Sequence, residues 1–198
     1  MKISDKITGI LERQGGVITS RQITAAGVHR QTTSLYVKAG LLERVASGVF
    51  VTPDGVVDDL FVLSMKASYG VLSHGSALFL NGITDRTPFE ATMTVANNRV
   101  LTPSLRKAVK CFYCAPALID LGRVLRKTPM GNEVVTYDCE RTVCDLIRSR
   151  ERLDDELVLD GLRQYAAKKD KNVARLGEYA KALGVLEDVR RTMEVVLW

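Results

Sequence analysis

Apolar residues at the start of the chain follow the spacing of a helix. They lie at positions i, i+4, i+7 and i+8 and therefore share one helix face: Ile3, Ile7, Ile10 and Leu11. The pair Gly15-Gly16 ends this helix, and the apolar pair Val17-Ile18 predicts a short strand. We expect this first helix to support the elements that follow.

A capping box marks the next helix. Thr19 is followed three residues later by Gln22, so each side chain can bond a free backbone N–H group of the first turn. The helix is predicted over residues 20–26 and ends at Gly27, because glycine takes the left-handed conformation at low cost. A second helix is predicted over residues 29–39.

Two short β-like runs come after these helices, at residues 42–45 and 49–52, with a hinge at residues 46–48. Two short helices joined by a glycine turn and followed by a hairpin are typical of a winged helix-turn-helix. In that architecture the second helix enters the major groove of DNA. We therefore predict a DNA-binding domain over residues 1–54.

The second of these helices divides into two faces. Its predicted inner face carries Val28, Thr32, Leu35 and Ala39. Its predicted outer face carries the candidate DNA contacts Arg30, Gln31, Thr33, Ser34 and Lys38. Arginine can bridge guanine O6 and N7, glutamine can pair with adenine, and the others reach phosphates or base edges. Arg44 and Ser47 of the hairpin are candidate contacts beside them. The same polar face also suits a winged helix that binds another protein.

The rest of the chain predicts a second, mixed domain over residues 55–198, after a turn signal at residues 53–55. Strands are predicted over residues 89–96, 109–114 and 133–137, and helices over residues 59–68, 73–80, 138–148, 155–168, 173–183 and 187–197. Ser73 and Asp138 are the expected N-caps of two helices, and Leu159 and Val173 are expected in the core. The fold class is therefore α+β, with a winged helix-turn-helix first and a helical bundle last.

Basic charge collects in two blocks. The net charge is +5, and lysine and arginine exceed aspartate and glutamate in residues 1–54 and again in residues 99–150. Candidate phosphate contacts besides the second helix are Arg21, Arg99, Arg106, Lys107 and Lys110. A solvated basic face is the simplest interpretation of the second block, phosphate contact is the next, and an acidic or RNA-bearing partner is the third.

Several features predict that the chain is not an enzyme. Nothing resembles a nuclease D…E-x-K arrangement, a P-loop or a G-x-G-x-x-G turn, and a helix start explains Ser73 and His74. Arg141 and Asp145 stand at i and i+4 and, with Glu140, suggest a structural network rather than toxin contact, DNA contact or catalysis.

The four cysteines predict neither a disulfide scaffold nor a metal site. Cys111 and Cys114 would point to opposite faces of a strand, and Cys139 and Cys144 stand far apart around a helix, so small buried hydrophobes are the simpler interpretation. We expect no metal, no cofactor and no membrane segment. The start of the chain resembles no signal peptide, so we expect a cytoplasmic protein.

Two groups of residues give the chain a family resemblance. The first group is Gly27, Leu35, Gly40, Leu42, Arg44, Gly48, Val49 and Phe50. The second comprises Ser73-His74-Gly75-Ser76-Ala77-Leu78 and the stretch from Tyr137 through Asp138, Glu140, Arg141, Thr142 and Asp145 to Leu146. At these spacings the chain resembles the AbiEi family, the antitoxins of type IV toxin–antitoxin (abortive phage infection) systems.

The resemblance implies two activities. The N-terminal domain would bind double-stranded DNA at inverted repeats in its own promoter and repress transcription. The C-terminal domain would oppose a nucleotidyltransferase-like toxin without a stable complex being required. Two other functions stay open, a winged helix that binds a protein partner and an unrecognised DNA-processing enzyme.

Overall fold

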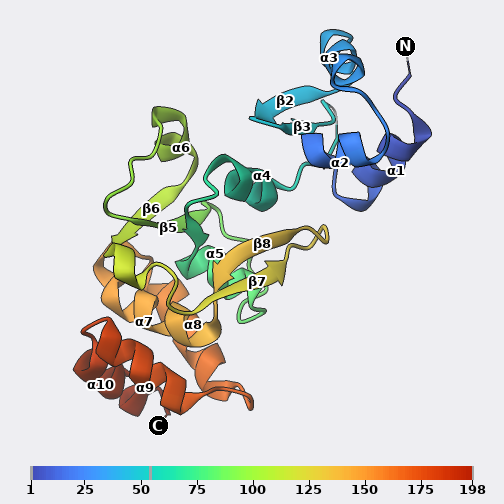
Figure 1. Ribbon diagram of the computed structural model, residues 1–198. Helices are drawn as coiled ribbons and strands as arrows, with labels where there is room; N and C mark the ends of the chain where they lie inside the picture. The colour runs from blue at the N-terminus through green and yellow to red at the C-terminus, as the bar shows by residue number, and fades with distance from the viewer. Residues whose placement is uncertain (1, 54, 198) are drawn as a thin grey trace. The chain divides into compact units, whose positions relative to one another are not determined.

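The computed structural model describes residues 2–53 and 55–197 and shows a mixed α+β chain (Figure 1). The chain forms two compact units. Unit 1 takes the chain up to Ser68 together with Lys127–Val134, and unit 2 takes Tyr69–Arg126 and the chain from Val135 onward. The predicted domain boundary falls on Asp54, which lies outside the described residues, so the division at that point stays a prediction.

Unit 1 contains short helices around a small antiparallel sheet. Its sheet has the strand order β1-β3-β2, with Val17 opposite Val51 and Arg44 opposite Phe50. The elements are α1 (Asp5–Arg13), β1 (Val17–Thr19), α2 (Ser20–Ala25), α3 (Arg30–Lys38), β2 (Glu43–Ala46), β3 (Val49–Val51) and α4 (Asp59–Lys66).

The local signals at α2 are confirmed. The Gln22 N–H donates to Thr19 Oγ1 at 3.3 Å, and the Thr19 N–H donates to Gln22 Oε1 at 2.8 Å. Gly27 takes the left-handed conformation, with φ of 82°. Apolar side chains from the helices and the sheet then form one core: Ile7, Leu11, Ile18, Ile23, Tyr36, Leu42 and Phe50.

The predicted inner face of α3 is wrong. Leu35 is 51% exposed, whereas Tyr36 is 5% exposed and Thr33 is 6% exposed. The inner face is thus rotated by one residue from the prediction. Tyr36 explains the difference, because its ring fills the core while its hydroxyl accepts a hydrogen bond from the Ser4 N–H at 3.2 Å.

Unit 2 is built on a mixed sheet of strand order β6-β5-β4-β8-β7. Its strands and first helices are β4 (Val71–Leu72), α5 (His74–Leu80), β5 (Thr92–Ala96), α6 (Pro103–Ala108), β6 (Lys110–Cys114), the 3₁₀ turn η1 (Pro116–Leu118), β7 (Arg123–Lys127) and β8 (Glu133–Tyr137). Strand β4 pairs antiparallel with β5 and parallel with β8, and β5 pairs parallel with β6.

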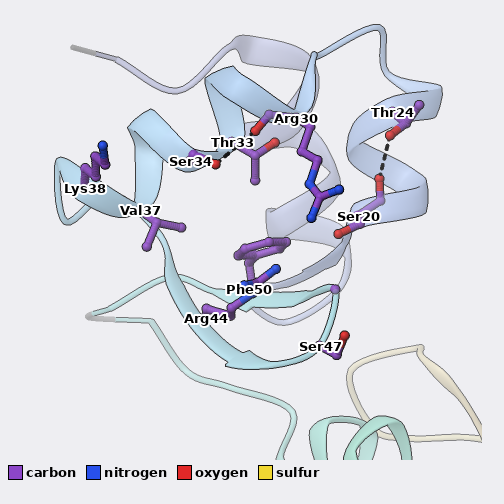
Figure 2. Close-up of a pocket in the computed structure, with 11 residues that line it drawn as sticks. Ser20, Thr24, Arg30, Thr33, Ser34, Val37, Lys38, Arg44, Ser47 and Phe50 are labelled. Carbon is purple, nitrogen blue, oxygen red and sulfur yellow. Dashed lines mark hydrogen bonds between the residues drawn. The ribbon is translucent and has the colours of Figure 1, made fainter.

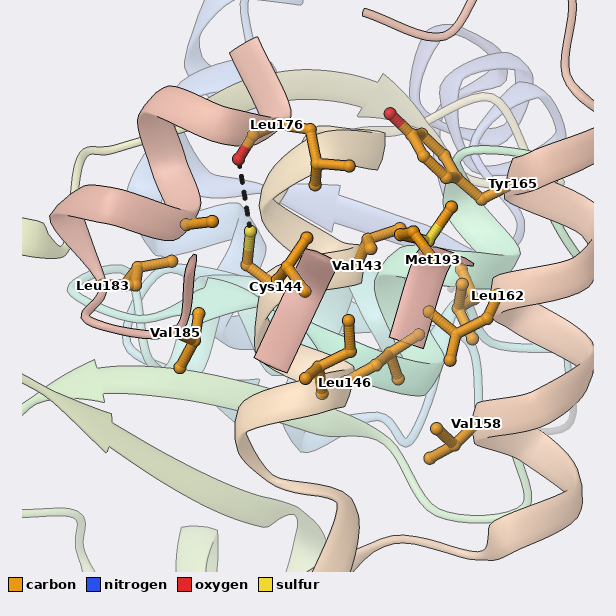
Figure 3. Close-up of a cluster of buried hydrophobic side chains, with 14 of the residues drawn as sticks. Val143, Cys144, Leu146, Val158, Leu162, Tyr165, Leu176, Leu183, Val185 and Met193 are labelled. Atoms are coloured by element: carbon orange, nitrogen blue, oxygen red, sulfur yellow. Dashed lines mark hydrogen bonds between the residues drawn. The ribbon is translucent and has the colours of Figure 1, made fainter. Parts of the chain in front are cut away.

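A helical bundle completes unit 2. It consists of α7 (Cys139–Arg148), the 3₁₀ turn η2 (Arg150–Arg152), α8 (Asp155–Ala167), α9 (Val173–Ala182) and α10 (Leu186–Leu197). Figure 3 shows its core, in which Val143, Cys144 and Leu146 of α7 meet Leu162 of α8 and Leu176 of α9. Among the described residues, no helix is long and apolar enough to cross a membrane.

Several predictions for this part of the chain are wrong. Leu159 and Val173 are 43% and 64% exposed rather than buried. The strand predicted over residues 89–96 begins only at Thr92, and Phe89 is fully exposed. Ser73 stands at the start of α5 but makes no side-chain cap, because its hydroxyl is engaged by His74 instead.

Asp138, by contrast, caps α7 as predicted, and its Oδ1 accepts a hydrogen bond from the Arg141 N–H at 2.8 Å. The predicted internal network is also present. Arg141 is paired with Asp145, and Glu140 accepts hydrogen bonds from the Tyr165 hydroxyl at 3.3 Å and the Asn172 N–H at 2.9 Å.

Candidate nucleic-acid interface

A groove of about 530 Å³ lies in unit 1 between α2, α3 and the β2–β3 hairpin (Figure 2). Three cationic side chains line it, Arg30, Lys38 and Arg44. Of the described residues that line the groove, none is acidic. A groove with this charge attracts a polyanion, since opposing charge draws anionic ligands into concave surfaces.

The first and last turns of α3 provide two of these cations. Arg30 is the first residue of α3 and Lys38 is the last, and both are exposed. Figure 2 shows the Arg30 side chain reaching across the groove, with the ring of Phe50 and Ser20 of α2 nearby. Lys38 stands at the opposite end of the helix. The two charges therefore lie at opposite ends of α3, and both line the groove.

Arg44 is positioned by an aromatic ring. Its guanidinium carbon lies 5.5 Å from the centre of the Phe50 ring, and the two residues are directly opposite each other on β2 and β3. The Phe50 side chain is itself 4% exposed and belongs to the core of unit 1. A cation over an aromatic face is attracted by the ring's charge distribution, so a fixed ring restricts the positions of the arginine.

The hairpin tip is held close to α2. A register irregularity lies between Arg44 and Ala46, and Gly48 follows with φ of 71°. The Ser20 N–H then donates to the Gly48 carbonyl at 2.7 Å. This bond keeps Ser47 and Gly48 at the edge of the groove, where both are lining residues.

The groove brings together most of the predicted DNA-contact residues: Arg30, Thr33, Ser34, Lys38, Arg44 and Ser47. Gln31 is exposed but does not line it. Thr33 lies in its floor, largely buried, with its hydroxyl directed at the His29 carbonyl. Ser20 and Thr24 of α2 also line the groove and were not predicted. The capping box located α2, but no signal in the sequence orients it toward the hairpin.

The other candidate phosphate contacts lie on both units. Arg21 is exposed on α2 of unit 1. Arg99, Arg106 and Lys107 are exposed on unit 2, and Lys110 begins β6 there, half-buried. Strand β6 stands at one edge of its sheet.

The cysteines are shielded rather than activated. Cys114 and Cys144 are buried, and Cys111 and Cys139 are partly buried. Burial raises the pKa of all four thiols, for Cys144 to about 12. A protonated thiol is a poor metal ligand and nucleophile. In the part of the chain that the structure describes, no cluster of three or more His, Cys, Asp or Glu side chains could hold a metal ion.

Comparison with protein families finds a match within the groove-bearing unit. Residues 5–53 match the family model of the transcriptional regulator, AbiEi antitoxin. The match runs from α1 through β3, and so contains every element that lines the groove. The resemblance to AbiEi antitoxins is confirmed over these residues, and the match supports a role as a regulator.

The remaining comparisons concern the whole chain. No curated protein matches it. Its fold is similar to the crystal structure of the RV2827C protein from Mycobacterium tuberculosis, with a TM-score of 0.63 and 14% sequence identity. The similarity covers 97% of this chain and 79% of the other. At this identity the likeness describes the fold alone.

Proposed function

We propose that the chain is a sequence-specific DNA-binding autorepressor that is also a type IV antitoxin. Residues 1–54 would form its winged helix-turn-helix, with α3 as the recognition helix and the β2–β3 hairpin as the wing. The observation that carries this proposal is the groove between α3 and the hairpin, lined by Arg30, Lys38 and Arg44 without an acidic residue among the described lining residues.

In this proposal α3 contacts the base edges and the wing contacts the phosphate backbone of DNA. Arg30, Gln31 and Ser34 are exposed at the N-terminal half of α3, the part of a recognition helix that meets base edges. Lys38, Arg44 and Ser47 would contact phosphates on either side. Leu35 is exposed on α3 as well and suits a thymine methyl group. Thr33 would support the groove from within.

Unit 2 would add phosphate contacts without reading sequence. Arg99, Arg106, Lys107 and Lys110 extend the footprint in this proposal, as does Arg21 on unit 1. The DNA site would be an inverted repeat in the chain's own promoter, because two copies of one protein match the symmetry of such a site.

The antitoxin activity is assigned to residues 55–198. The matched family is described as both regulator and antitoxin, and the match covers residues 5–53, which leaves residues 55–198 as the part proposed here for the second role. The opposing toxin would be nucleotidyltransferase-like and would be counteracted in the cytoplasm without a stable complex. Repression and antitoxicity would then be separable by mutation.

Binding to a labelled fragment of the upstream region tests the repressor proposal. We expect Arg30→Ala and Arg44→Ala to weaken binding about tenfold each. Arg30→Ala should also relax the preference for the upstream sequence, whereas Arg44→Ala should flatten the logarithmic salt dependence by about one unit, since it removes a phosphate contact. Arg13→Ala is the matched control, since Arg13 is exposed on α1 and outside the groove. Equal affinity for the upstream fragment and random DNA would refute sequence-specific repression.

Co-expression with a nucleotidyltransferase encoded beside this gene tests the antitoxin proposal. The wild-type chain should restore growth, and Arg30→Ala should restore it equally while losing repression of a promoter reporter. Growth arrest that the wild-type chain fails to relieve would refute the antitoxin activity but leave the repressor proposal standing.

The exposed Leu35 also favours a second function, a winged helix that binds a protein. Leu35→Ser distinguishes the two. If α3 binds a protein partner, Leu35→Ser should abolish binding of that partner. In that case both the variant and the wild type should bind the upstream fragment no more tightly than random DNA.

A further inference from the structure

A second cavity, of about 210 Å³, lies within unit 2 and plays no part in the proposed DNA contact. The start of α5, strands β5 and β6, the end of α7 and the turn η2 surround it. Its polar lining includes His74, Tyr113, Arg148, Ser149 and Arg152. The cavity is smaller than the usual drug-sized pocket of roughly 300–1,000 Å³, so it suits a small ligand or one end of a larger one.

His74 is the unusual residue of this cavity. Its backbone is left-handed, with φ of 48°, and its side chain is 2% exposed. The imidazole stacks on Phe112, with the ring centres 3.6 Å apart. A non-glycine residue in this conformation is strained, and such strain persists only where the surroundings hold it and is concentrated at functional sites.

A chain of hydrogen bonds runs from Thr94 through Ser73 and His74 to Ser149. Thr94 Oγ1 donates to Ser73 Oγ at 2.9 Å, and Ser73 Oγ lies 2.8 Å from His74 Nδ1. Because the Ser73 hydroxyl accepts a hydrogen bond from Thr94, it can donate its own hydrogen to His74 Nδ1. Nε2 of the neutral ring then carries the proton and donates to Ser149 Oγ at 3.2 Å. Ser149 thus keeps its hydroxyl proton for an acceptor in the cavity that it lines.

Burial, with the surrounding positive charges, keeps this ring neutral. Burial lowers the pKa of His74 to about 3, and the positive charges of Arg141, Arg152 and Arg148 add to the effect. A hydrogen bond to the Asp145 backbone opposes this lowering of the pKa only in part, and the Asp145 carboxylate is paired with Arg141. Glu151 is the one further carboxylate in the lining. With the Asp145 carboxylate paired to Arg141, the lining offers two guanidinium groups, Arg148 and Arg152, against one further carboxylate, together with hydroxyl groups.

One of the cations is already fixed in place. The guanidinium carbon of Arg152 lies 4.4 Å from the centre of the Phe112 ring, and Nη2 donates to the Cys111 carbonyl at 3.0 Å. The Phe112 ring therefore stacks with His74 and also has the Arg152 guanidinium over it. A fixed guanidinium loses less freedom on binding, which favours bidentate recognition of a phosphate.

We propose that this cavity binds a small phosphate-bearing molecule, with Arg148 and Arg152 holding the phosphate oxygens and Ser149, oriented by His74, donating the third hydrogen bond. This ligand is distinct from the phosphate backbone of DNA. The inference does not rest on the DNA-binding proposal, because all its residues belong to unit 2.

Nuclear magnetic resonance of the full-length protein at neutral pH tests the site. The chain has two histidines, so His29→Gln assigns the imidazole signals. Inorganic phosphate and adenosine monophosphate should each shift the His74 signals saturably and leave those of His29 unchanged. Stronger binding of the nucleotide than of phosphate would identify a nucleotide site, and equal binding would identify a site for phosphate itself.

Three substitutions make the test specific. Arg148→Gln and Ser149→Ala should weaken phosphate binding about tenfold each, the usual size for one charge-assisted contact. Arg150→Gln is the matched control, because Arg150 directly follows Ser149 in sequence and lines a different groove. The proposal is wrong if neither compound moves the His74 signals, if Arg150→Gln weakens binding as much as Arg148→Gln, or if duplex DNA alone produces the shift.

Discussion

Arg141 donates through Nε to both carboxylate oxygens of Asp145, at 3.1 Å each. The two side chains are 0% and 5% exposed. Nη1 of Arg141 also donates to the carbonyls of Leu118 and Leu121, at 2.8 and 2.9 Å. The pair therefore ties α7 to the turn before β7, and its attraction acts in an environment with little water.

Asp145→Ala should lower the free energy of unfolding by about 3–5 kcal/mol, because it leaves the Arg141 charge buried without its partner. Joint replacement by Arg141→Met and Asp145→Ala should recover part of that loss. Urea denaturation followed by circular dichroism measures both effects. Glu178→Ala, which removes an exposed carboxylate of α9, should change stability by less than about 0.5 kcal/mol. A similar small loss for Asp145→Ala would contradict the role given to the pair.

His74 should make stability depend on pH. The pKa of His74 is lowered to about 3 in the folded chain, mainly by burial, whereas an unfolded histidine titrates near its ordinary value of 6.5. Between these values the unfolded chain binds a proton that the folded chain does not. Stability is therefore complete above pH 6.5 and falls as the pH drops toward 3, by at most about 1.4 kcal/mol per pH unit.

The measurement compares the pH dependence of stability in the wild type and in His74→Asn, since asparagine also tolerates the left-handed backbone. The two curves should converge as the pH falls below 6.5. His29→Asn, which replaces the other histidine of the chain at an exposed position, is the control. Parallel curves for His74→Asn would mean that His74 is charged in the folded chain.

Local signals in the sequence were sufficient for much of the fold. The capping box of Thr19 and Gln22 and the N-cap Asp138 depend on residues three positions apart. All the residues that form each cap can therefore be identified within a few positions of the sequence. The same is true of α3 and the hairpin, which together bring most of the predicted contact residues into one groove. Residue type and short spacing determine these features.

Features that depend on distant partners could not be predicted. Tyr36 faces inward because Ser4, 32 residues earlier, provides a donor for its hydroxyl. Strand β4 has only two residues and exists because β5 and β8 lie on either side of it. The Ser73 hydroxyl bonds His74 Nδ1 instead of capping α5. The other ring nitrogen of His74 bonds Ser149, 75 residues later in the sequence. No pattern along the chain encodes these contacts.

Asp58 should be the residue on which the β7–β8 loop depends. It caps α4 by accepting a hydrogen bond from the Phe61 N–H at 3.1 Å. Its other oxygen accepts from Asn132 Nδ2 at 2.8 Å and from the Thr128 hydroxyl. Asp58→Ala removes the cap, leaves the buried Thr128 hydroxyl without its acceptor and leaves Asn132 Nδ2 with the Gln14 carbonyl alone, at an expected cost of about 2–4 kcal/mol.

Hydrogen exchange of residues 127–134 and of α4 measures this effect. Both segments should exchange faster in Asp58→Ala, whereas Asp58→Asn should keep part of the protection because its remaining oxygen can still cap the helix. Asp59→Ala is the control, since Asp59 is the exposed neighbour in the same turn. Unchanged exchange in residues 127–134 would show that Asp58 does not hold the loop.

Replacing Gly48 by alanine should destabilise the protein, whereas replacing Gly177 by alanine should stabilise it. Gly48 at the hairpin tip has φ of 71°, and a Cβ there would lie 3.3 Å from Ser20 Oγ. Alanine in this left-handed conformation costs about 1–2 kcal/mol, and the contact with Ser20 adds to the strain. Gly177 stands inside α9, where a Cβ would have no neighbour within 4 Å, so alanine should stabilise the helix by about 1 kcal/mol.

Thermal unfolding of the two variants measures their change in stability, and their DNA affinity is a second, independent measurement. Gly48→Ala should lower the melting temperature and weaken DNA binding, because the Ser20 N–H bonds the Gly48 carbonyl and holds the hairpin beside α2. Gly177→Ala should raise the melting temperature and leave DNA affinity unchanged. If Gly48→Ala melts earlier but binds DNA as the wild type does, the hairpin tip supports the fold without contacting DNA, and recognition must depend on α3 alone.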